Sequence, residues 1–175
     1  MYHSESNDNF VLDKFIELFD QKNIKFFSDK EKNYFASIFL QISNKDLLIK
    51  TEKIFIKYAL PVSFEKIFYE LLQALSDIKY ELNQLEYNPI NQKVTFKNKT
   101  IKLKSFHNII FKNLFLNKDT GIQKELIYLN LWPNDKDIMI NKLDTHLTNL
   151  KNFLKEELDF NLQFVSSAGM IKLVG

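Results

Sequence analysis

The sequence predicts a mixed α+β protein made of two parts, a small α/β domain over residues 1–82 and a second domain over residues 83–175. Apolar residues recur every three or four positions in several segments of both halves, which predicts helices. Between residues 94 and 103 they alternate instead with Lys and Thr, which predicts a β-hairpin. The proline-containing stretch NPIN, residues 88–91, follows closely on the first half, and we place the boundary just before it.

The N-terminal half begins with a predicted helix over residues 9–22, for which Asn9 is a suitable capping residue. A second helix is predicted within residues 62–82, where Phe64, Ile67, Phe68, Leu71, Leu72 and Leu75 form one apolar stripe. The segments between these helices are two short apolar stretches typical of strands, at 24–29 and 34–43, and one that fits a helix or strands, at 47–61.

The C-terminal half reads as strand, strand, helix, helix, helix, strand, strand. The first hairpin turns at residues 97–99, and its strands flank that turn. The helices are predicted at 106–117, 122–132 and 140–158, and the final hairpin lies within 162–175 around the sequence SSAG. Three helices followed by a C-terminal hairpin predict a winged helix-turn-helix, in which the third helix enters the major groove of DNA.

Composition excludes several classes of function. The sequence has no cysteine, which excludes disulfides and thiolate metal sites and fits a cytoplasmic location. The three histidines are dispersed and there is no glycine-rich phosphate loop, so we expect no catalytic residues, no metal or other cofactor, and no enzyme activity. We also expect no membrane partner, because no stretch approaches ~20 uninterrupted apolar residues and the N-terminus does not resemble a signal peptide.

Charge is distributed unevenly along the chain. All 24 basic residues are lysine, so the chain lacks the bidentate guanidinium group that suits guanine and phosphate. Residues 1–80 hold 11 Lys against 12 Asp and Glu, a balance of −1, whereas residues 81–175 hold 13 Lys against 10 acids, a balance of +3. This balance permits a nucleic-acid partner for the C-terminal half without requiring one.

The helix predicted at 140–158 carries the functional argument. Its four spaced leucines, at 143, 147, 150 and 154, form one narrow face, and Asn and Thr side chains lie opposite, flanked by Lys. Asn can pair with adenine, and the Thr methyl group can pack on thymine, while Lys and hydroxyl groups contact phosphates. The alternative is a polar helix face that is simply solvated.

From about Leu85 onward the chain resembles the winged-helix effector domain of OmpR/PhoB-type response regulators. The resemblance is carried by YNPINQKVTFKNKTIKLKSFHNIIFKNLFLNKDTGIQKELIYLNLWP, by NKLDTHLTNLKNFL and by FVSSAGMIKL, in that order. In the second stretch Leu143, Asp144, His146 and the later leucines are in register with the family's recognition helix.

The resemblance implies a set of DNA contacts. Base edges in the major groove would be contacted by Asp144, Thr145 and Asn149, and phosphates by Asn141, Lys142, His146, Thr148 and Lys151. Trp132 would pack at the end of the second helix or donate its indole N–H to a phosphate. Three of these residues have a plainer interpretation: Trp132 as a core anchor, Asp144 as an orienting group and His146 as a passive edge residue.

The family's arginines are missing. Asn141, Asn149 and Lys151 stand where three of them would be expected, and Ser166 replaces the arginine of the wing, the C-terminal hairpin. Each lost charged contact removes neutralisation of a phosphate, so we expect weaker DNA binding than is usual in the family. The short segment PNDKD, residues 133–137, resembles the loop through which such regulators contact RNA polymerase, which makes the polymerase a candidate partner.

The N-terminal half resembles the end of a receiver domain at IKYALPVSFEKIFYELLQAL, where Pro61 matches and Leu60 replaces the phosphate-contacting lysine. Gln41 would stand at the phospho-acceptor position, so the resemblance implies a reduced receiver-like domain without aspartyl phosphorylation, which forms a homodimer through a Phe-rich face. An unrelated small α/β or helical dimerisation domain is the alternative.

These observations predict an atypical response regulator of the two-component type that binds double-stranded DNA and controls transcription. The alternative is a winged-helix module for protein–protein interaction without sequence-specific DNA binding.

Overall fold

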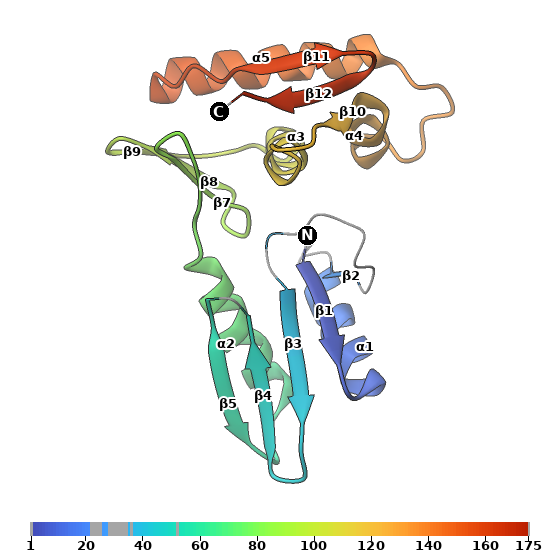
Figure 1. Cartoon of the computed structure of the whole chain (residues 1–175), viewed down its shortest axis with the longest axis vertical. Helices are drawn as coiled ribbons and strands as arrows, with labels where there is room; N and C mark the ends of the chain where they lie inside the picture. The colour runs from blue at the N-terminus through green and yellow to red at the C-terminus, as the bar shows by residue number, and fades with distance from the viewer. Residues whose placement is uncertain (1, 22–25, 28–34, 36, 52, 175) are drawn as a thin grey trace. The chain divides into compact units, whose positions relative to one another are not determined.

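The computed structural model describes residues 2–21, 26–27, 35, 37–51 and 53–174. These residues form five helices and three β-sheets, a mixed α+β architecture, and the chain divides into two compact units, Met1–Ile78 and Lys79–Gly175 (Figure 1). The division lies four residues before the boundary expected from the sequence, because Tyr80–Leu82 form a strand that pairs within the second unit.

The first unit contains a five-stranded sheet of order β2-β1-β3-β4-β5. Strand β1 runs parallel to β2 and β3, whereas β4 is antiparallel to both of its neighbours. Its elements are β1 (Tyr2–Ser6), α1 (Asn9–Asp20), β2 (Phe26–Phe27), β3 (Ser37–Ile42), β4 (Asp46–Lys50), β5 (Phe55–Ala59) and α2 (Phe64–Ser76). The segment 47–61, which the sequence left open between helix and strands, therefore supplies two strands. Strand β1 was not predicted.

One face of this sheet packs on the two helices. Ile38 and Leu40 of β3 are buried, as are Leu47 and Ile49 of β4, in the alternation expected of a sheet with one covered face. Both helices lie behind the sheet in Figure 1, and their rings meet, with the Phe19 and Phe68 centroids 4.8 Å apart. The N-cap of α1 is Asp8 rather than the expected Asn9, since the Asp8 side chain accepts from the N–H of Val11.

The second unit begins with a four-stranded antiparallel meander, β6 (Tyr80–Leu82), β7 (Leu85–Asn88), β8 (Lys93–Phe96) and β9 (Lys99–Lys102). The predicted hairpin at 94–103 is its β8–β9 pair. The β6–β7 turn was not predicted because Asn83 and Gln84 both adopt positive φ, +48° and +64°, without the glycine that usually marks such a turn.

Three helices follow, α3 (Ser105–Leu116), α4 (Lys124–Leu131) and α5 (Ile140–Leu158), with the two-residue strand β10 (Ile122–Gln123) before α4. The C-terminal hairpin, β11 (Phe164–Ser167) and β12 (Met170–Leu173), joins β10 in a sheet of order β10-β12-β11. Tyr87 ties the meander to α3, because its ring meets Phe111 at 4.9 Å and its hydroxyl donates to Asn108 Oδ1 at 2.7 Å.

Helix α5 is held by its leucine face. Leu143, Leu147, Leu150 and Leu154 are each at most 2% exposed, and Leu158 extends the same stripe by one more turn. Figure 1 shows α5 running alongside the β11–β12 hairpin, so the predicted order of third helix and terminal hairpin is present. No helix among the described residues has both the length and the apolar character that crossing a membrane requires.

Candidate nucleic-acid interface

The face of α5 opposite the leucines is solvent-exposed over its first four turns. Its side chains are uncharged amides and threonines, from Asn141, Thr145, Thr148, Asn149 and Asn152. Both threonine hydroxyls donate back to the helix, Thr145 to the carbonyl of Asn141 and Thr148 to that of Asp144, each at 3.0 Å. These bonds turn the hydroxyls toward the backbone, which leaves the methyl groups on the outer surface.

The loop between α4 and α5, residues 132–139, folds onto one flank of this helix. Asp135 Oδ2 accepts from the Tyr128 hydroxyl at 2.6 Å and from Lys142 Nζ at 3.1 Å. The same ammonium lies 4.0 Å from the centroid of the Trp132 ring. The hydrogen bond from Tyr128, and then Lys142, hold the pKa of Asp135 below its ordinary value, and the bond to Asp135 raises the pKa of Tyr128. Lys142 is therefore already paired with an anion.

Two more of the predicted residues are engaged at this end of α5. Asp144 forms an ion pair with Lys124 at the start of α4, 2.7 Å from Oδ1 to Nζ, and the Lys124 side chain is only 15% exposed. His146 stacks on Phe106 of α3 at 5.4 Å and also meets Trp132 at 5.4 Å. Asp144 thus orients a neighbouring helix, and Trp132 and His146 form an aromatic cluster with Phe106.

The side nearer the C-terminal hairpin is more open. Lys151 Nζ lies 5.9 Å from the Phe164 ring of β11 and forms no ion pair with any described residue. Ser166 on β11 is exposed, and its hydroxyl donates to the carbonyl of Met170 at 3.2 Å. On the opposite flank, facing α3, Asn149 is exposed as well, so Lys151, Ser166 and Asn149 keep polar atoms available to a ligand.

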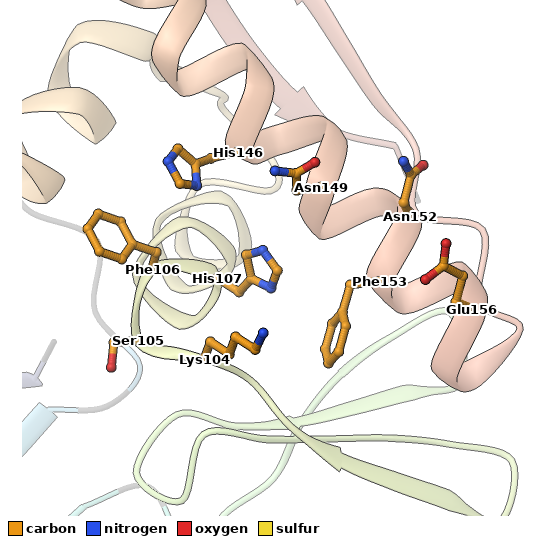
Figure 2. A pocket seen from close by; sticks show the side chains of 9 residues that line it. All are labelled: Lys104, Ser105, Phe106, His107, His146, Asn149, Asn152, Phe153 and Glu156. Carbon is orange, nitrogen blue, oxygen red and sulfur yellow. The ribbon is translucent and has the colours of Figure 1, made fainter.

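A groove of about 770 Å³ runs between the first turn of α3 and the flank of α5 (Figure 2). Its lining combines cationic, aromatic, amide and acidic groups, from Lys104, Ser105, Phe106, His107, His146, Asn149, Asn152, Phe153 and Glu156. The Nδ1 atom of His107 is buried and has no hydrogen-bond partner among the described residues. Burial lowers the pKa of His107, and the nearby His146 and Lys104 lower it further.

Three features of this unit were not singled out from the sequence: a lysine-rich segment, the zero net charge of α5 and the pairing of Asp135. The segment 93–104 contains five lysines and no acid, and all five, Lys93, Lys97, Lys99, Lys102 and Lys104, are exposed. Helix α5 itself is neutral, since three lysines, at 142, 151 and 155, balance three acids, at 144, 156 and 157. A lysine count over short windows would have found the first feature. The pairing of Asp135 depends on how the loop folds and has no local signal.

The described part of the chain contains no group of three His, Cys, Asp or Glu residues arranged to hold a metal ion. Compared with known proteins, the sequence matches no protein-family model and no curated protein.

Proposed function

We propose that the protein is a transcriptional regulator that binds double-stranded DNA, with α3, α4 and α5 and the β11–β12 hairpin acting as a winged helix-turn-helix. The observation that carries this proposal is the outer face of α5, which is exposed, polar and free of carboxylates through Asn152. A helix that buries five leucines while presenting amides, hydroxyls and methyl groups to solvent has the chemistry of a base-reading surface.

In this proposal the contacts divide by type. Asn149 and Thr145 read base edges, Asn149 through its amide and Thr145 through its methyl group. Lys151 and Ser166 contact phosphates on the hairpin side, and Trp132 and Lys142 do so at the other end of α5. His146, an expected phosphate contact, contributes through its ring stack, while Asp144, an expected base contact, supports the interface by its pairing with Lys124.

The first unit is proposed to be a reduced receiver-like domain that forms a homodimer without phosphorylation. The strand order β2-β1-β3-β4-β5 supports this, because receiver-type doubly wound sheets have the same order. The antiparallel β4 departs from that pattern, and the link from β3 to β4 is only residues 43–45, too short for a helix. Phe39 and Phe55, 45% and 67% exposed on the same face of the sheet, suit a dimer contact.

Fluorescence anisotropy with a mixed-sequence DNA duplex tests the DNA-binding proposal. The double variant Asn149→Asp with Lys151→Glu should weaken binding by about tenfold at low salt and reduce the dependence of log affinity on log salt by about one unit, since one phosphate contact is lost. The same two substitutions at Asn44 and Lys45, exposed in the β3–β4 turn, provide a matched control that should bind like the wild type. Equal binding by both variants, or no wild-type binding at low salt, would sink the proposal.

A protein–protein interaction module is the second candidate function. It is favoured by the apolar residues that α4 and the following loop expose, Leu126 (53%), Leu129 (41%), Ile138 (43%) and Met139 (54%). Such side chains are costly on a surface that has no apolar partner. The RNA polymerase contact implied by the family resemblance would use this side of the unit. Two results together would favour this function: the wild type binds no DNA, and the double variant Leu126→Lys with Leu129→Lys no longer binds a protein partner that the wild type binds.

A further inference from the structure

Lys142 and its surroundings form an anion site that is already filled from within the chain. Asp135 Oδ2 receives two donors, the Tyr128 hydroxyl at 2.6 Å and Lys142 Nζ at 3.1 Å. The ammonium is fixed from the other side by Trp132, whose ring centroid lies 4.0 Å away. A cation held on an aromatic face with a hydroxyl donor beside it offers the same donors to any singly charged oxygen anion.

We propose that this cluster of Tyr128, Trp132 and Lys142 is a phosphate-binding cradle, and that Asp135 is its internal competitor. Under the proposed function, on which this inference rests, the incoming group is a backbone phosphate of DNA. A phosphate oxygen takes the place of Asp135 Oδ2 and accepts from Lys142 and Tyr128. The released carboxylate moves out with its loop.

The exchange is physically accessible because neither partner of the ion pair is deeply buried. The side chains of Lys142 and Asp135 are 35% and 34% exposed, so a phosphate can approach both. Tyr128 is fully buried, so its hydroxyl meets the phosphate only at the position that Asp135 vacates. Ion pairs at this exposure contribute little net stability, and replacing one anion by another in the same position changes few other contacts.

The loop that carries Asp135 is held at few points. The Asp135 N–H donates to the carbonyl of Trp132 at 3.2 Å, and the Tyr128 hydroxyl lies 3.4 Å from the carbonyl oxygen of Asp137. A backbone hydrogen bond from Met139 to Tyr128 holds the end of the loop as well, so loss of the carboxylate contact frees chiefly residues 133–136. In this way phosphate binding at the base of α5 is coupled to the conformation of the α4–α5 loop.

The chain offers a direct reporter and a matched control. Trp132 is the single tryptophan, so its emission responds to the ammonium above its ring and to any anion that changes that position. Asp135→Asn removes the competing charge while keeping an oxygen that accepts from Tyr128. Asp137→Asn makes the same change in the same loop, at an exposed side chain that forms no ion pair with any described residue.

The experiment titrates the full-length wild type and both variants with inorganic phosphate against sodium chloride at equal ionic strength, following Trp132 emission, and then with duplex DNA by anisotropy. We expect Asp135→Asn to bind both phosphate and DNA about three- to tenfold more tightly than Asp137→Asn, because one nearby negative charge is removed. Asp135→Asn should also steepen the salt dependence of DNA binding by about one unit. Adding Lys142→Gln should remove the gain.

Equal responses from Asp135→Asn and Asp137→Asn in both titrations would overturn the cradle, even if all the proteins bind DNA. A gain for phosphate that Lys142→Gln abolishes, with no DNA binding by any protein, would keep the cradle and reject the proposed regulator function. A gain in DNA binding that survives Lys142→Gln would assign the effect to general charge and reject the cradle.

Discussion

The two ends of the candidate interface differ in how far their side chains are already satisfied. At the start of α5, Lys142 pairs with Asp135, Asp144 pairs with Lys124, and His146 stacks on Phe106. One to two turns further along α5, Asn149 in the α3–α5 groove and Lys151 beside β11 face solvent, and on the hairpin the Ser166 hydroxyl donates to the Met170 carbonyl. The first end is built as a small structural core, and the second end is left open to a ligand.

The residues at one end of the interface hold α5 in position, and those at the other end leave polar atoms exposed to a ligand. The closed end ties α5 to α4 and to the α4–α5 loop, so it positions the polar face of α5 while neutralising its own charges. The open end keeps its polar atoms for a partner but contributes few charges, because Ser166 and Asn149 are uncharged. Under the proposed function, the asymmetry would let a helix of zero net charge bind a polyanion, since Lys151 and the released Lys142 would act separately.

The largest effect should come from the leucine face on which both ends depend. Leu147 is 2% exposed, and Leu147→Ala should lower the free energy of unfolding of the second unit by about 2 to 5 kcal/mol through lost burial and a residual cavity. Asn149→Ala, on the opposite face of the same helix, should change it by less than about 0.5 kcal/mol. Urea unfolding followed by Trp132 emission measures both. Similar losses for the two variants would contradict the assigned faces.

A smaller effect should separate the closed end from the open one. Asp144→Asn should cost about 0.5 to 1 kcal/mol of unfolding free energy, because it leaves the largely buried Lys124 without its partner. Glu157→Gln, an exposed acid on α5 with no ion pair to a described residue, should cost nothing measurable. The same urea titration checks this pair at low salt. If the two substitutions are equivalent, the closed end is not a stabilised cluster and the contrast between the ends disappears.

The sequence was sufficient for the elements whose pattern is local. The leucine spacing predicted α5, and the alternation of Val94, Phe96 and Ile101 predicted the β8–β9 hairpin. Both follow from periodicity, which needs no knowledge of the rest of the fold. The strands β1 and β6 carried no clear period, and the segment 47–61 forms strands by pairing β4 with β3 and β5 with β4.

The candidate site divides in the same way. The polar face of α5 could be predicted because helical geometry alone places Thr145 and Asn149 opposite the leucines. The partners of Lys142 and Asp144 could not, because Lys124 is 20 residues from Asp144 and Asp135 reaches Lys142 only when the loop folds back. Side-chain pairing across a loop depends on tertiary structure, and the sequence alone gives the charges without their positions.

The smallest expected effect concerns the groove that joins the two ends, where His107 lies tilted against Phe153 at 5.4 Å. Burial, and then His146 and Lys104, lower the pKa of His107 below 6.5, so the unfolded chain binds a proton more readily than the folded one. As the pH falls below 6.5, protonation of the unfolded chain should therefore reduce stability, until the pH reaches the lowered pKa of the folded state.

His107→Leu removes both the titratable imidazole and its buried Nδ1 atom. At pH 7.5 the substitution should therefore leave the free energy of unfolding unchanged or raise it slightly. Urea midpoints of the wild type and the variant should then separate between pH 6.5 and 5, with the wild type losing more. Glu156, the one acid in the groove, opposes this trend if it approaches the imidazole, and Glu156→Gln should then enlarge the separation. Parallel midpoints across this range would mean that His107 stays as solvated as in the unfolded chain. The groove would then be a solvent-filled space rather than a part of the packed cluster at the start of α5.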